Sequence, residues 1–184
     1  MSYEEMLEIA KSASDHEVRV QEFEPAIIES FAHTDTQFPA LEIGNGAGGS
    51  AILILAHIHK EGKHRELLTA DAHDCPQLIV DWAKKLDIPH KHTQMAQELF
   101  VTDVAKNYTL GFVYLDADHD PTNVVRDIGI LIPRLAKGAI VAVDDVEDWG
   151  ELPGFEGLER IEYAVDEGNK LGVHGHHISF WRKL

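Results

Sequence analysis

The stretch FVYLDADHD at residues 112–120 decides the fold class of this chain, together with AIVAVDD at residues 139–145. Each is a run of β-branched and aromatic apolar residues that ends abruptly in carboxylates. An apolar run of this length predicts a strand buried on both faces, as in a parallel sheet. Open α/β sheets bind their ligands beyond the carboxyl ends of the strands. We therefore expect Asp116, Asp144 and Asp145 to meet at one place, where their oxygens would suit a hard cation such as Mg²⁺ or Ca²⁺.

Apolar periodicity predicts strands and helices that alternate along the middle of the chain. The expected strands are residues 40–43, 66–71, 111–116 and 139–144, with a short segment at 90–94, and the expected helices are residues 49–60, 76–86, about 96–106 and 121–135. In the last of these helices Pro121 suits the first turn, Asp120 the N-cap and Gly138 the C-cap. The alternation predicts an α/β fold with a mostly parallel sheet and right-handed crossovers.

The two ends of the chain depart from this alternation. Before it we expect two amphipathic helices, and after it a turn-rich loop, a helix and a final strand; these are residues 3–13, 24–32, 145–157, about 156–168 and 176–182. The short stretch at residues 170–173 leads into the tail through a His-Gly turn. This arrangement favours an antiparallel closing hairpin at the C-terminal end of the sheet.

The composition is that of a globular protein. The 184 residues are 44% hydrophobic and 8% aromatic. We expect one domain, residues 1–184, with N-terminal helices at 1–37 and the binding and catalytic core at 38–184.

The formal net charge of −16, without a basic cluster, argues against a nucleic-acid partner. No apolar run approaches the roughly 20 residues that span a bilayer. The acidic N-terminus without a signal-peptide core, together with the single Cys75, predicts a cytoplasmic protein without a membrane partner.

The glycine-rich segment GNGAGGS at residues 44–50 joins an expected strand to an expected helix. Glycines there let a ligand approach the backbone, and the helix N-terminus offers free N–H groups. The spacing of Gly44, Gly46 and Gly49 matches the dinucleotide fingerprint, with Asp71 at the distance expected for a ribose-binding acid. A tight turn without a ligand is the alternative.

Glu42 shifts the interpretation from a dinucleotide to S-adenosylmethionine. It lies inside the strand, two residues before the first glycine, and a buried carboxylate is costly unless it meets hydrogen-bond donors or a cation. S-adenosylmethionine carries an ammonium and a sulfonium, whereas a dinucleotide would bring its pyrophosphate to this loop. A dehydrogenase would also need a further substrate domain, for which 184 residues leave no room.

With these residues assembled, residues 38–184 resemble the class I S-adenosylmethionine-dependent methyltransferases. More narrowly, the chain is similar to the metal-dependent small-molecule O-methyltransferases, the group of catechol-type and antibiotic- and macrolide-tailoring enzymes. The motifs that carry the resemblance are EIGNGAGGS at 42–50, Asp71, LDADH at 115–119 and VDD at 143–145. The resemblance implies a Rossmann-like three-layer sandwich with a seven-stranded sheet. It also implies methyl transfer to a hydroxyl of a small molecule. The sequence leaves the oligomeric state open, with a homodimer as one possibility.

The resemblance also implies a role for each matching residue. The cofactor would be held by Glu42, Gly44, Asn45, Gly46, Gly48, Ser50, Asp71, Ala96, Gln97 and Asp116, with Ala96 and Gln97 at the adenine. A divalent cation, Mg²⁺ or a similar ion, would be held by Asp116, Asp144 and Asp145. His119 follows the first of these acids by three residues and falls where the family carries its general base.

Several alternatives remain open on the sequence alone. Asp116 could instead hydrogen-bond the cofactor, as acids do at this position in methyltransferases without a metal, and His119 could be a passive donor. The chain could accordingly be a metal-free methyltransferase acting on N, C or O, a non-catalytic S-adenosylmethionine-binding protein, or a small NAD-binding module. Among the other histidines, His57 and His59 are expected on or near a helix surface. His90 and His92 alternate on one strand face and are expected to be partly exposed.

Overall fold

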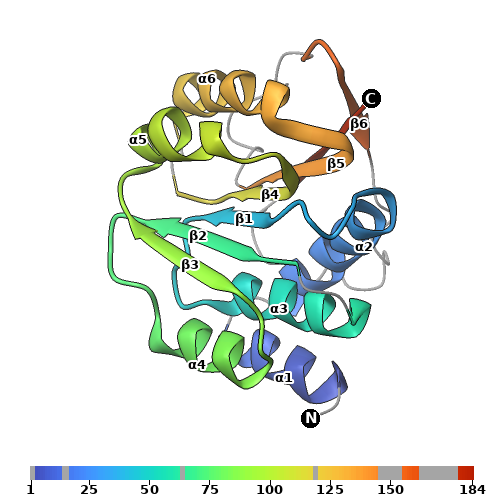
Figure 1. Cartoon of the computed structure of the whole chain (residues 1–184), viewed down its shortest axis with the longest axis vertical. Helices are drawn as coiled ribbons and strands as arrows, with labels where there is room; N and C mark the ends of the chain where they lie inside the picture. Colours follow the sequence, from blue (N-terminus) through green and yellow to red (C-terminus); the bar gives the residue numbers. More distant parts are fainter. Residues whose placement is uncertain (1–2, 14–16, 63–64, 118–119, 145–154, 162–177) are drawn as a thin grey trace.

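A computed structural model describes residues 3–13, 17–62, 65–117, 120–144, 155–161 and 178–184. These residues form a seven-stranded sheet with the order β3-β2-β1-β4-β5-β7-β6 (Figure 1). The strands are β1 Ala40–Ile43, β2 Leu67–Asp71, β3 His90–Gln94, β4 Leu110–Leu115, β5 Leu135–Val143, β6 Leu158–Ile161 and β7 Ser179–Lys183. The first five run parallel, and β7 pairs antiparallel with both β5 and β6. The predicted mostly parallel sheet with an antiparallel C-terminal strand is confirmed.

Helices cover both faces of this sheet. The elements on one side are α1 Tyr3–Ala13, α2 Glu17–His33, α3 Gly49–Glu61 and α4 Gln77–Lys85, and those on the other are α5 Gln97–Leu99, a π-helical turn Phe100–Val104, a 3₁₀ turn Ala105–Asn107 and α6 Pro121–Leu131 (Figure 1). Two separate apolar cores result, because successive strand residues point to opposite faces. Leu67 packs in the core beneath α1 to α4, whereas its neighbour Leu68 packs in the core beneath α5 and α6. The predicted three-layer sandwich is thus confirmed.

The N-terminal end of α6 agrees with its sequence signals. The Asp120 carboxylate accepts hydrogen bonds from the backbone N–H groups of Thr122 and Asn123, and Pro121 occupies the first turn. This cap satisfies donors that the first helical turn leaves free. None of the described helices is long and apolar enough to cross a membrane.

The C-terminal end of α6 differs from the prediction of a helix over residues 121–135 capped by Gly138. The α-helix ends at Leu131, a 3₁₀ turn spans Ile132–Arg134, and β5 already begins at Leu135. Gly138 lies inside β5 with a φ of 83°, where the register against β4 shifts. Gly138 therefore allows an irregularity within a strand and does not cap a helix.

The region after β5 also differs from the prediction of a helix near residues 156–168. Residues 158–161 form β6, which pairs antiparallel with β7, and residues 162–168 lie outside the described part of the chain. Leu158 and Ile161 are three residues apart, a spacing typical of a helix face. Pairing with β7 nevertheless makes this segment a strand. The proposed hairpin partner at residues 170–173 is likewise outside the described residues.

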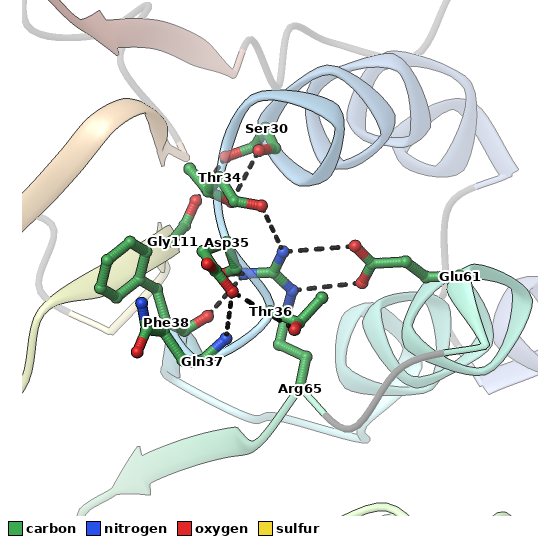
Figure 2. Close-up of polar contacts among 9 residues, drawn as sticks. All are labelled: Ser30, Thr34, Asp35, Thr36, Gln37, Phe38, Glu61, Arg65 and Gly111. Atoms are coloured by element: carbon green, nitrogen blue, oxygen red, sulfur yellow. Dashed lines mark hydrogen bonds and ion pairs between the residues drawn. The ribbon is translucent and has the colours of Figure 1, made fainter.

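A completely buried arginine fixes the loop that leads into β1 (Figure 2). The Arg65 guanidinium donates to the backbone oxygens of Phe38 at 2.5 Å, Asp35 at 3.2 Å and Thr34 at 3.3 Å. It also pairs with the Glu61 carboxylate at 3.4 Å. Burial lowers the pKa of Arg65, while Glu61 acts in the opposite direction. Because three carbonyls and a carboxylate surround it, this cation holds the end of α2 against the start of the sheet.

Candidate cofactor and active site

The candidate site lies where β1, β2, β4 and β5 end. Backbone hydrogen bonds continue the parallel ladder one residue beyond the strands, from Gly44 N to Ala70 O at 2.9 Å and from Asp116 N to Ile43 O at 2.8 Å. A third bond joins Asp144 N to the oxygen of Leu115 at 3.0 Å, so Asp116 and Asp144 leave adjacent strands at the same level. The structure thus brings two of the three predicted strand-end acids side by side. Asp145, the third, lies outside the described residues.

The glycine loop after β1 is built on left-handed backbone. Gly44, Gly46 and Gly48 have φ values of 92°, 45° and 93°. A Cβ on Gly44 would overlap the backbone carbonyl of Asp116 and lie 2.8 Å from the nitrogen of Ala117. Gly44 is therefore required both by its φ and by the close approach of β4. Around Gly46 nothing would lie within 4 Å of an added Cβ, so the loop is open there.

Glu42 is fully buried beneath this loop. Its carboxyl accepts hydrogen bonds from the Ser50 hydroxyl and from Asn45 Nδ2, the second at 3.1 Å. Burial raises the pKa of Glu42 to about 8, and the two donors only partly oppose that rise. At neutral pH the group therefore lies close to its titration point. A cation beside it would favour the carboxylate.

Asn45 supplies a further sign of a ligand at this loop. Its Oδ1 is buried without a hydrogen-bond partner among the described residues. A buried amide oxygen of this kind is costly, since it has lost its water without gaining a donor. The neighbouring carboxyl of Glu42 and the close-packed glycines complete a polar cradle. Its acceptor oxygens fit a small molecule that carries an ammonium and other N–H groups.

Asp71 at the end of β2 holds the other side of the loop. Its Oδ2 accepts the backbone N–H of Asn45 at 2.7 Å, and its Oδ1 accepts that of His73 at 2.9 Å. The side chain is partly exposed, and each carboxylate oxygen has a second lone pair. Asp71 can therefore order the loop and still accept hydrogen bonds from hydroxyl groups of a ligand.

The acids after β4 and β5 differ in their surroundings. The Tyr114 hydroxyl donates to Asp116 Oδ2 at 3.1 Å, and Asp116 is partly exposed. Asp144 is buried, with 2% of its surface exposed. Within the described ranges no cluster of three or more His, Cys, Asp or Glu side chains is arranged to hold a metal. His119, like Asp145, lies outside the described residues, so the roles predicted for both stay predictions.

The segment after β3 places the remaining predicted residues. The backbone N–H of Met95 donates to Asp71 O at 2.7 Å, which brings Ala96 and Gln97 near the end of β2. Ala96 is exposed, whereas Gln97 is buried and its Nε2 donates to Asp127 Oδ2 on α6 at 2.9 Å. The adenine contacts of Ala96 and Gln97 stay predictions.

Among the described histidines, His57 lies on α3, and His90 and His92 lie on β3. His57, expected on a helix surface, is instead buried; its Nε2 lies 2.7 Å from the Tyr3 hydroxyl, and burial lowers its pKa to about 4. The helix face that carries it is covered by α1, which the pattern of α3 alone does not reveal. The prediction for His90 and His92 is confirmed, because both are partly exposed and both contact the Thr69 hydroxyl.

Sequence reasoning missed Tyr114 and the orientation of Asn45. Tyr114 looked like one apolar residue in a buried strand, and its only signal was its spacing of two from Asp116, which puts both side chains on one face. Asn45 was expected to contact a ligand, but its bridge between Glu42 and Asp71 depends on the loop conformation.

A sheet of this order, with a glycine loop after β1 and acids after β2, β4 and β5, defines the fold of the class I S-adenosylmethionine-dependent methyltransferases. The chain itself belongs to a family described as a methyltransferase domain, whose model matches residues 41–146. A comparison with curated proteins finds no significant match.

Solved structures share this fold. Cofactor-bound Rv0187 from MTB is 16% identical, with a TM-score of 0.62 over 98% of this chain and 88% of that one. The putative methyltransferase yhhF from Escherichia coli is 13% identical, with a TM-score of 0.65 over 92% and 88%. An rRNA methylase from Streptococcus thermophilus is 13% identical, with a TM-score of 0.63 over 89% and 97%. The MycE methyltransferase from the mycinamycin biosynthetic pathway matches 60% of this chain, which spans only 30% of MycE, at 19% identity and a TM-score of 0.46.

Proposed function

We propose that this chain binds S-adenosylmethionine at the glycine loop and transfers its methyl group to a hydroxyl of a small molecule. The observation that carries the proposal is the buried carboxyl of Glu42 beside the buried, unpartnered Oδ1 of Asn45. A cationic amino-acid moiety would satisfy both groups, because its ammonium can donate to each. Membership of the methyltransferase-domain family supports the same ligand.

The fit of the cofactor to the remaining residues follows from the chemistry of each group. When bound, S-adenosylmethionine would supply the methyl group of its sulfonium, which the acceptor oxygen takes while S-adenosylhomocysteine leaves. Asp71 would accept hydrogen bonds from the ribose hydroxyls, and the backbone at Gly44 and Gly46 lets the ligand approach closely. Ala96 and Gln97, next to the end of β2, would border the adenine.

The acids after β4 and β5 would hold a divalent cation and so orient the acceptor. Asp116 and Asp144 leave adjacent strands, and Asp145 would join them. Carboxylates that gather at one edge of a sheet repel each other unless a cation or a proton lies between them. His119 would take the proton of the acceptor hydroxyl, since imidazole has a suitable pKa near neutrality. The net charge of −16 favours a small acceptor over a nucleic acid.

The test combines cofactor binding with a methyl-transfer screen. Calorimetry should detect binding of S-adenosylmethionine and S-adenosylhomocysteine but not of NADH. A screen over catechols, phenols and sugar hydroxyls should give methylated product with Mg²⁺, and excess chelator should abolish it. Undiminished turnover in excess chelator would mean that the reaction proceeds without a metal. Tight NADH binding without any response to S-adenosylmethionine would overturn the proposal.

A further inference from the structure

We propose that Tyr114 is a positioning residue that holds the Asp116 carboxylate ready for the divalent cation. Its hydroxyl donates to Asp116 Oδ2 at 3.1 Å, while the residue itself is 2% exposed. This inference rests on the proposed function, because it concerns how one of the expected cation ligands is oriented.

Tyr114 is itself rigidly held. It lies in the middle of the sheet, where β4 pairs with β1 and Tyr114 stands opposite Glu42. Its ring packs against Phe23 of α2, with centroids 4.4 Å apart and planes at 55°. A side chain packed between a sheet and a helix has few rotamers available. The hydroxyl therefore presents a fixed donor at the carboxyl edge of the sheet.

The backbone of Asp116 is equally constrained. Its N–H donates to Ile43 O, and the absence of a side chain on Gly44 lets the two strand ends pack in direct contact. With the backbone fixed, the remaining freedom of Asp116 is the rotation of its side chain. The hydrogen bond from Tyr114 restricts that rotation and occupies one of the four lone-pair positions of the carboxylate.

Restricting this rotation has a chemical consequence for cation binding. A carboxylate that must be ordered at the moment of binding loses conformational entropy, whereas a pre-oriented one does not. Groups that hydrogen-bond metal ligands from outside the coordination shell commonly tune affinity in this way. An apolar side chain would fill the buried space at residue 114 equally well. The phenol adds a hydroxyl, and this hydroxyl donates to the candidate ligand Asp116.

The experiment compares Tyr114→Phe with Tyr3→Phe in the full-length chain. Each variant removes a hydroxyl that donates to a carboxylate, since the Tyr3 hydroxyl donates to Glu24. Tyr3 lies on α1 and contacts His57, away from the acids after β4 and β5. Calorimetric titration with Mn²⁺, in the presence of saturating S-adenosylhomocysteine, measures cation affinity directly. Titration with S-adenosylhomocysteine alone and thermal unfolding complete the set.

We expect Tyr114→Phe to weaken Mn²⁺ binding by roughly tenfold to 100-fold, the usual effect of removing a hydrogen-bond partner of a metal ligand. Its S-adenosylhomocysteine affinity should stay within about twofold of the wild type, and Tyr3→Phe should bind Mn²⁺ like the wild type. Equal Mn²⁺ affinities for all three proteins would overturn the inference while leaving the proposed function intact. A wild-type protein that binds S-adenosylhomocysteine but no Mn²⁺ would overturn both the inference and the cation in the proposed reaction.

Discussion

Gly44 and Asp116 pack so closely that a methyl group on Gly44 would overlap the backbone carbonyl of Asp116. Gly44 begins the glycine loop, and Asp116, the candidate cation ligand, begins the loop after β4. The two halves of the site are therefore joined backbone to backbone, without an intervening side chain. A substitution at Gly44 should therefore disturb both the glycine loop and the loop after β4.

Gly44→Ala tests this contact. The substitution adds left-handed strain at a φ of 92° to a steric overlap with β4, and we expect it to cost about 2–5 kcal/mol of unfolding free energy. Urea denaturation measures the change. The matched control is Gly46→Ala, where the loop is open and only strain of about 1–2 kcal/mol is expected. Equal losses for the two variants would contradict the packing argument.

Glu42 should make the stability of the ligand-free protein depend on pH. Burial raises its folded-state pKa from 4.5 to about 8, so the fold favours the protonated form. Its stabilising contribution is fully present below pH 4.5 and is lost as the pH rises toward 8. Relative to Glu42→Gln, wild-type stability should fall through that window by up to about 1.4 kcal/mol per pH unit, measured by urea denaturation. Parallel profiles for the two proteins would refute this.

The same group should couple cofactor binding to proton release. A cation placed beside Glu42 favours the carboxylate, so binding near pH 7 should expel a fraction of a proton. Calorimetry in buffers of different ionisation enthalpy measures that fraction. Glu42→Gln should abolish this release, whereas Glu156→Gln, an exposed control, should retain it.

Asp71→Ala should destabilise the glycine loop and weaken cofactor binding. The variant loses the two backbone hydrogen bonds to Asn45 and His73, as well as any bond to a ribose hydroxyl. We expect S-adenosylhomocysteine affinity to fall by about 1–3 kcal/mol in calorimetry. Asp74→Ala removes an exposed acid from the same turn and should bind normally. If both variants bind like the wild type, Asp71 is no cofactor residue.

A substitution at Arg65 should lower the stability of the fold without changing cofactor affinity. Arg65→Lys cannot reproduce the planar donor set that reaches three carbonyls and Glu61 (Figure 2), so we expect about 2–4 kcal/mol of destabilisation in urea. Arg134→Lys, at an exposed position, is the control. Cofactor affinity measured well below the melting temperature should be unchanged. A large loss of affinity there would mean that the network also shapes the site.

His119→Ala should remove the expected general base. Turnover should fall by roughly 10²–10⁴-fold, while S-adenosylhomocysteine affinity changes little, and the rise of rate with pH near neutrality should disappear. Steady-state rates across pH, once an acceptor is found, provide the measurement. His59→Ala, on the exposed surface of α3, serves as the control. A variant that keeps its rate but loses cofactor binding would make His119 a cofactor residue.

The alternating core could be predicted from the sequence because its signals are local. Apolar runs, turn residues and a capped helix start act over a few positions, and they placed β1, β2, β4 and β5 and the loop between β1 and α3. The convergence of Asp116 and Asp144 followed as well, since neighbouring parallel strands end at the same edge.

What only the tertiary structure decided depends on contacts between distant segments. Residues 158–161 became a strand because β7 offered a free edge, although their apolar spacing also suits a helix. His57 is buried because α1 covers it, and Arg65 is buried because carbonyls of a loop some 30 residues earlier surround it. The hydrogen bond from Tyr114 to Asp116 needed a fixed side-chain rotation within a packed sheet. Periodicity specifies which face a residue occupies, whereas its partner on that face is set by the packing of the whole chain.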